Sequence, residues 1–176
     1  DLYIELGLIK VPDYIYHGIN EKLTATAMKS SVVDIAKGKY LVIGGSDQQK
    51  NISCVVKAFT SLYEKQTLVT PAVVIIGLTS KDFLRYNLCN HISPNIFFLS
   101  YLDHSHVQDA IELAKCVIVP SFYESFGLPV IESLHNGKAV ICSDRGALKE
   151  IGEDAPIYFD PKSPSSLVNE IDQYER

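Results

Sequence analysis

Short apolar runs alternate with segments of helical periodicity along most of this chain. The runs are rich in β-branched residues and have the length of buried strands, whereas the apolar residues between them recur at the spacing of one helix face. This alternation predicts an α/β fold with a Rossmann-like, doubly wound parallel sheet. The predicted strands lie at 40–43, 71–77, 95–99, 116–119, 139–142 and 157–159, and the predicted helices at 52–63, 80–88, 105–114, 129–136, 147–151 and 164–171.

Capping residues indicate where several of these helices begin and end. Ser80 and Ser163 are suited to the N-cap position, and a Ser-x-x-Gln capping box begins at Ser105. Pro129 suits the first position of a helix, and Gly137 is placed to end that same helix. The N-terminal signals follow predicted loops and Gly137 precedes one, so they support the same order of elements.

Loops that follow parallel strands meet at one edge of the sheet, where ligands of such folds bind. The first of these loops contains the turn Gly44-Gly45-Ser46 and then Lys50, directly before a helix. A glycine turn, a cation and a helix N-terminus in series predict a phosphate site. The loops expected to line this edge span 44–50, 77–80, 100–103 and 121–128.

The stretch PSFYESFGLPVIESLHNG, residues 120–137, carries the clearest candidate chemistry. Its loop contains Glu124, and its helix contains Glu132 after a Phe-Gly-Leu-Pro turn. The helix N-terminus offers free N–H groups and a partial positive charge to an anion. With two carboxylates beside it, this arrangement suits a ligand that combines phosphate with hydroxyl groups. Taken singly, each glutamate is more simply explained as a solvated residue or a partner of the helix dipole.

The pair of glutamates around F-G-L-P resembles the E-x7-E motif of retaining GT-B glycosyltransferases of the family 4 type. The segment that ends in Lys50-Asn51 resembles the part of that family that contacts the donor diphosphate. The resemblance extends over residues 11–175 and implies that the chain is the nucleotide-sugar-binding half of a GT-B fold.

The resemblance also implies a role for each motif residue. Glu132 holds the ribose hydroxyls, and Glu124 reaches the hydroxyls of the transferred sugar. Lys50 neutralises the charge that grows on the leaving diphosphate, so Glu124 and Lys50 are the implied catalytic residues. Backbone N–H groups of residues 126–128 face the phosphates. The full donor-binding set is Gly44, Gly45, Ser46, Lys50, Gly77, Ser100, Tyr101, Leu102, Glu124, Ser125, Phe126, Gly127, Leu128 and Glu132.

Residues 11–20, VPDYIYHGIN, resemble the segment with which such enzymes cross from the acceptor domain into the donor domain. Residues 1–20 are therefore predicted to be a hinge, and residues 21–176 the nucleotide-sugar-binding domain. Because the chain begins with Asp1, we expect it to be a piece of a longer protein. The piece is expected to bind donor without transferring sugar. The full-length enzyme is expected to move a hexose, with retained configuration, to a glycan, polysaccharide or lipid-linked acceptor.

The net charge and the histidine content limit the classes of ligand that the chain is expected to bind. A net charge of −5 offers no basic face for nucleic acid, so a phosphate ligand must be held by local groups. His104 and His106 have no further His or Cys cluster nearby in the sequence, so no metal site is predicted. No cofactor is expected, because the donor substrate is itself a UDP- or GDP-linked sugar.

The cysteines and the lengths of the apolar runs indicate where in the cell the protein is expected to be. The four cysteines lack C-x-x-C spacing, and most fall within apolar runs, which indicates reduced core residues of a cytoplasmic protein. No apolar run reaches the ~20 residues that span a bilayer. Peripheral association of the full-length protein with the inner face of a membrane is compatible with a lipid-linked acceptor.

Three other functions stay open at this point. A GT-B sugar-nucleotide epimerase would need acid and base groups from the absent half. A catalytically silent nucleotide-sugar-binding module is suggested by Gly45 and Gln49, which stand where family members often carry Arg. A flavodoxin-like or receiver-type domain fits the α/β pattern but leaves the glutamate pair unexplained.

Overall fold

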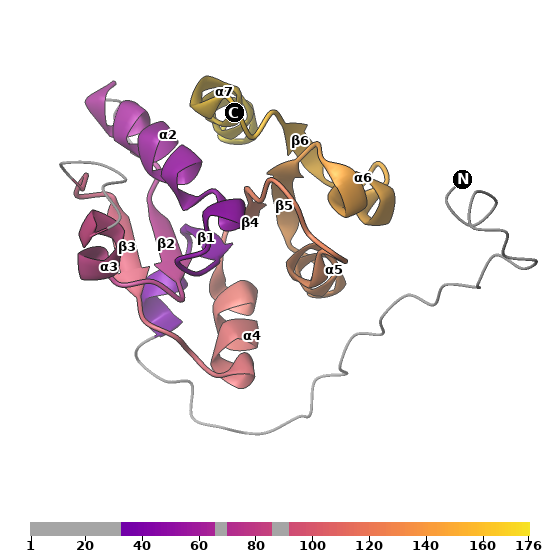
Figure 1. The fold of residues 1–176 in the computed structure, drawn as a ribbon, viewed down its shortest axis with the longest axis horizontal. Coiled ribbons are helices and arrows are strands. Elements are labelled where there is room, and N and C mark those ends of the chain that lie inside the picture. Colours follow the sequence, from indigo (N-terminus) through magenta and orange to yellow (C-terminus); the bar gives the residue numbers. More distant parts are fainter. Residues whose placement is uncertain (1–32, 66–69, 86–91) are drawn as a thin grey trace, which may run out of the picture.

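The computed structural model describes residues 33–65, 70–85 and 92–176, so the predicted hinge at 1–20 lies outside the described residues. Its strands form one six-stranded sheet in the order β3-β2-β1-β4-β5-β6, and every neighbouring pair is parallel (Figure 1). This order confirms the predicted Rossmann-like, doubly wound fold. The strands are β1 (Tyr40–Ile43), β2 (Val73–Ile76), β3 (Ile96–Leu99), β4 (Cys116–Val119), β5 (Ala139–Ser143) and β6 (Ile157–Phe159).

Helices cover both faces of this sheet. On one face α2 and α7 pack against each other and against the strands, and on the other lie η1, α4, α5 and α6 (Figure 1). Side chains of β1 alternate between the two layers, because successive residues of a strand point to opposite faces. The helical elements are η1 (Val33–Ala36), η2 (Gln48–Lys50), α2 (Ile52–Glu64), α3 (Ser80–Arg85), α4 (His104–Leu113), α5 (Leu128–His135), α6 (Gly146–Gly152) and α7 (Pro164–Tyr174).

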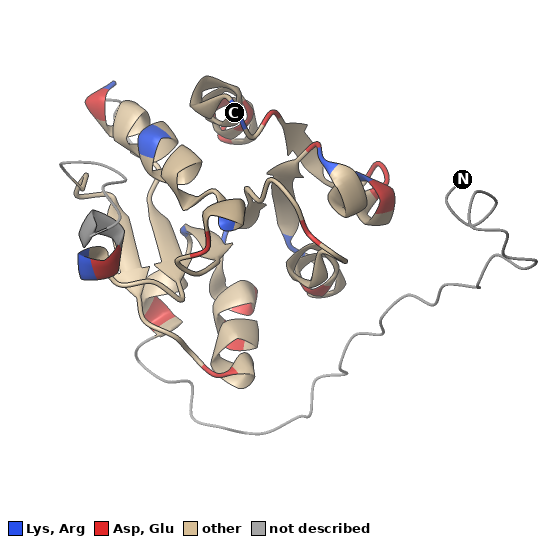
Figure 2. Ribbon diagram, viewed as in Figure 1, with Lys and Arg blue, Asp and Glu red and all other residues tan. Residues whose placement is uncertain are grey.

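The interior of the sheet is apolar. The six described strands contain no Lys, Arg, Asp or Glu, and Figure 2 shows the charged residues on helices and loops instead. Cys54, Cys116 and Cys142 are buried and free, as predicted, and burial raises the pKa of their thiols to about 11, 12 and 12. Among the described helices none has the length and apolar character needed to cross a membrane.

Several predicted helix boundaries are confirmed. The Ser163 hydroxyl accepts the backbone N–H of Ser166 and caps α7. Gly137 follows the end of α5 with φ of +68°, the left-handed backbone that a C′ glycine supplies. Pro129 is the second helical residue rather than the predicted first, because the helix already begins at Leu128.

Two predicted caps are wrong. The α4 helix begins at His104, and the Asp103 carboxylate caps it, so Ser105 lies inside the first turn. The Thr79 hydroxyl accepts the N–H of the third α3 residue, so Ser80 is already helical. In both cases a better or earlier acceptor, one or two residues upstream, takes the capping position.

Candidate functional site

The carboxyl ends of the strands open onto a cavity of about 500 Å³. A second cavity of about 320 Å³ adjoins it, because the two share Ile43, Lys50 and Pro129. The loops after β1, β3 and β4 therefore meet at one rim, as the strand order requires. The larger cavity is lined by Ile43, Lys50, Tyr101, Leu102, His104, Val107, Glu124, Ser125, Phe126, Gly127, Leu128, Pro129 and Glu132, and the smaller also by Gly44, Gly45, Ser46 and Asp47.

Lys50 and Glu124 form an ion pair that joins two loops of this rim. Nζ of Lys50 lies 2.8 Å from Oε1 of Glu124, and the side chains are 28% and 12% exposed. The Ser121 hydroxyl donates to the same oxygen at 2.6 Å. Within the described ranges, Oε2 of Glu124 makes no hydrogen bond, so this oxygen is available to a donor group of a ligand.

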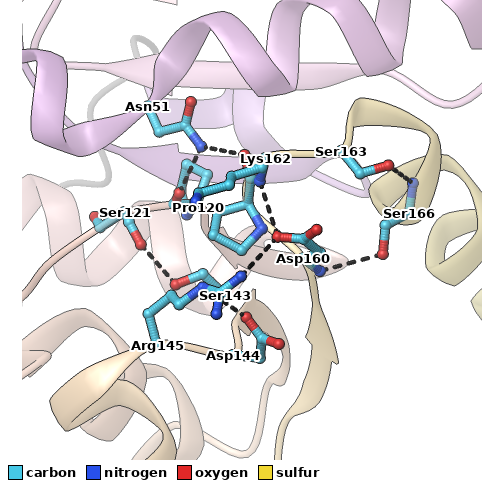
Figure 3. Close-up of polar contacts among 11 residues, drawn as sticks. Asn51, Pro120, Ser121, Ser143, Asp144, Arg145, Asp160, Lys162, Ser163 and Ser166 are labelled. Carbon is cyan, nitrogen blue, oxygen red and sulfur yellow. Dashed lines mark hydrogen bonds and ion pairs between the residues drawn. The ribbon is translucent and has the colours of Figure 1, made fainter.

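The residues on either side of Lys50 hold the β4–α5 loop in place. The Phe122 N–H donates to the Gln49 carbonyl at 2.8 Å. The Asn51 amide donates to the carbonyls of Pro120 and Pro161 at 3.0 and 2.8 Å, as Figure 3 shows for Pro120. The loops that carry Lys50 and Glu124 therefore form one connected unit.

The loops after β5 and β6 support this unit from the other side. The buried Ser143 hydroxyl donates to the Ser121 carbonyl at 2.6 Å (Figure 3). Arg145 lies between two carboxylates, with Nη2 2.9 Å from Asp160 and Nε 3.1 Å from Asp144. The Ser143 contact ties the β4–α5 loop to β5, and the contact of Arg145 with Asp160 ties the loop after β5 to the loop after β6.

The N-terminus of α5 points its helix dipole toward the cavity. Gly127 occupies the N-cap position with φ of +77°, and a Cβ there would lie 2.8 Å from the Leu148 side chain. Within the described part of the chain no side chain caps this helix start, and Glu132 lines the cavity one turn later. An uncapped helix start beside Lys50 makes this part of the rim suited to an anion.

The remaining predicted residues lie around this centre. Gly77 has φ of +94°, and a Cβ there would lie 2.0 Å from the Gly44 carbonyl oxygen, so the β1 and β2 loops approach closely. Tyr101 is 85% exposed, and both Tyr101 and Leu102 line the larger cavity. Gly77 and Ser100 follow β2 and β3 but are not among the lining residues.

Sequence reasoning missed three residues that organise the rim, namely Asn51, Ser121 and Ser143. Asn51 is 5% exposed and has a left-handed φ of +52°, a conformation that Asn tolerates better than most residues. Its position between a cation and a helix start was the available signal. Ser121 lies three positions before Glu124, so their spacing was the available signal, whereas Ser143 gave none, because its contact with the Ser121 carbonyl depends on how the strands are ordered.

The comparisons with known proteins identify the family. The family model described as glycosyl transferases group 1 matches residues 26–176, which is most of the chain. The chain belongs to the glycosyl transferases group 1 family. The resemblance of residues 120–137 to GT-B glycosyltransferases is therefore confirmed at the level of the family.

Curated relatives of this glycosyl transferases group 1 chain are longer proteins. The chain is 28% identical over 138 residues to O-antigen chain mannosyltransferase B of Escherichia coli, which covers 77% of the chain and 36% of that protein. It is 28% identical over 138 residues to the uncharacterized glycosyltransferase MJ1607 of Methanocaldococcus jannaschii, covering 76% and 34%. The chain thus spans about a third of the length of these relatives.

Solved structures show the same fold. The C-terminal domain of a glycosyl transferase group 1 family protein (LpcC) from Francisella tularensis matches with a TM-score of 0.62 and 22% identity, over 80% of this chain and 77% of that one. Sucrose-phosphate synthase from Thermosynechococcus elongatus matches with a TM-score of 0.62 and 24% identity, over 80% and 37%. The group 1 chain therefore has the fold of a GT-B C-terminal domain.

Metal binding by this group 1 domain has no support in the part of the chain that the structure describes. There, His, Cys, Asp and Glu side chains nowhere gather in threes that could hold a metal ion. Metal independence stays a prediction, and a titration in chelator tests it.

Proposed function

We propose that this domain binds a nucleotide-sugar donor, and that the full-length protein transfers the sugar with retained configuration. The observation that supports the proposal is the contact between Lys50 and Glu124 beside the N-terminus of α5. A cation and a helix start suit a diphosphate, and a carboxylate with one open oxygen suits a sugar hydroxyl. All three features line the same cavity, which has the size of a small-molecule site.

Each group has a separate part in this proposal. Lys50 stabilises charge on the diphosphate as the glycosidic bond breaks, and a partly enclosed cavity strengthens that electrostatic effect. Glu124 accepts a hydroxyl of the transferred sugar, and Glu132 accepts the ribose hydroxyls. Gly44, Gly45 and Ser46 give the phosphates access to backbone at the adjoining cavity. The reaction also needs an acceptor substrate, and we assign the binding of this acceptor to a separate N-terminal domain of the full-length protein.

Mannose is the first sugar to test. Two curated relatives from Escherichia coli are named mannosyltransferases, at 28% and 23% identity. The proposed substrates are therefore a UDP- or GDP-linked hexose and a glycan, polysaccharide or lipid-linked acceptor. We place this chemistry in the cytoplasm, with peripheral membrane association where the acceptor is lipid-linked.

Calorimetric titration of the domain with UDP, GDP and their hexose conjugates tests donor binding. Lys50→Ala should weaken the preferred diphosphate by about 1.5–3 kcal/mol, the range for a hydrogen bond to a charged group, and leave the nucleoside unchanged. Lys65→Ala is the matched control, because it removes an ion pair of 2.7 Å between Lys65, directly after α2, and Asp172 in α7. Equal weakening of nucleoside and diphosphate by Lys50→Ala would contradict the assignment.

A further inference from the structure

The carboxylate of Glu124 is held by two donors of different kinds. Lys50 Nζ lies 2.8 Å from Oε1, and the Ser121 hydroxyl donates to the same oxygen at 2.6 Å. Lys50 lines the cavity and is open to a ligand, whereas Ser121 is 1% exposed and is not among the lining residues. Ser121 therefore contacts Glu124 from the protein interior and not from the cavity.

This difference matters when an anion enters the cavity. A diphosphate attracts Lys50, so the cation is then shared between the ligand and Glu124. The neutral, buried hydroxyl of Ser121 does not respond to the ligand's charge. It keeps Oε1 in place, while Oε2 makes no hydrogen bond within the described ranges. A hydroxyl is thus a more constant support for Glu124 than the lysine is.

Ser121 is itself fixed by its neighbours. Its carbonyl accepts the hydroxyl of Ser143 at 2.6 Å, and Ser143 is fully buried in β5 (Figure 3). The residues on either side of Ser121 are also hydrogen-bonded. The Pro120 carbonyl accepts a hydrogen bond from the Asn51 amide, and the Phe122 N–H donates to the Gln49 carbonyl in the loop after β1. The backbone of Ser121 is therefore held in place, and this fixes the position from which its hydroxyl contacts Glu124.

We propose that Ser121, supported by Ser143, is the positioning residue that presents the free oxygen of Glu124 to the sugar of the donor. This inference rests on the proposed function, in which Glu124 binds the transferred sugar. It assigns a specificity role to a buried serine that touches no substrate. It predicts that the serine affects recognition of the sugar and leaves recognition of the diphosphate unchanged.

The test compares two ligands, a nucleotide diphosphate and its hexose conjugate, by calorimetry. Ser121→Ala should weaken the conjugate about tenfold, or about 1.4 kcal/mol, and change the bare diphosphate less than about twofold. Ser121→Thr keeps a hydroxyl and should restore most of the affinity. Ser143→Ala should weaken the conjugate by a smaller factor, about threefold, because it acts through the Ser121 carbonyl.

A control separates positioning from stability. Ser163→Ala removes the N-cap of α7, so it should lower the melting temperature and leave both affinities unchanged. Equal effects of Ser121→Ala on the two ligands, or no effect on either, would overturn the positioning role alone. If Ser121 variants fail to fold, the same comparison on Ser143→Ala decides. A wild-type domain that binds neither ligand overturns the proposed function and this inference together.

Discussion

Replacing Glu124 by Gln should change the affinities for bare diphosphate and sugar conjugate differently. In the free domain Glu124 pairs with Lys50 at 2.8 Å, so an incoming diphosphate competes with the carboxylate for the lysine. Gln has nearly the same shape and still accepts a hydrogen bond, but it carries no charge. The difference between a charged and a neutral hydrogen bond is about 1–1.5 kcal/mol. Glu124→Gln should therefore bind the nucleotide diphosphate about five- to tenfold more tightly.

The sugar conjugate should respond differently. It shares the gain at Lys50 but loses the charged contact between Glu124 and the sugar hydroxyl, also about 1–1.5 kcal/mol. Its affinity should change little, so the preference for conjugate over diphosphate falls about five- to tenfold. Calorimetry near physiological ionic strength suits this comparison, because salt screens exposed pairs more than half-buried ones.

Asp172→Asn is the matched control for this experiment. It removes the charge of an ion pair of 2.7 Å between Lys65 and Asp172, and both of those side chains are more exposed than the pair at the rim. It should leave both affinities unchanged. A diphosphate that binds Glu124→Gln no more tightly than wild type would refute the competition between Glu124 and the phosphates.

Further expectations concern stability, pH, metal and turnover. Gly77→Ala should lower the free energy of unfolding by at least about 3 kcal/mol, because its Cβ meets the Gly44 carbonyl, whereas Gly137→Ala, in open space, should cost about 1–2 kcal/mol in urea titrations. The Lys162 backbone N–H and then Arg145 lower the pKa of Asp160 below 3.8. Because the pKa of Asp160 is lower in the folded state, its carboxylate stabilises the fold at pH values above the unfolded-state pKa. The difference in melting temperature between wild type and Asp160→Asn should therefore shrink as the pH falls below 3.8. Chelator should not change donor affinity, and a metal-dependent loss would contradict that prediction. The isolated chain should not transfer sugar faster than it hydrolyses the donor, as product analysis would show.

Local patterns in the sequence determine the elements and much of the rim. Apolar runs and helical spacing depend on near neighbours in the chain, which is why all six strands of the described residues could be predicted. The cap at Ser163 was correct for the same reason, whereas Ser105 failed because Asp103, two residues upstream, competes for the capping position. The spacing of Glu124 and Glu132 likewise indicated the family, because both glutamates belong to one continuous loop and helix.

Only the tertiary structure decided which of these residues touch. Lys50 and Glu124 are 74 positions apart, and Asn51 reaches carbonyls 69 and 110 positions away. Nothing in the local pattern encodes these contacts. The contacts of Lys50 with Glu124 and of Asn51 with Pro120 arise because the strand order places β1 directly beside β4, so that the loops after two strands distant in sequence share one edge. The ion pair between Lys50 and Glu124 exists because the chain crosses over at that point, whereas Ser121 reaches Glu124 within one loop.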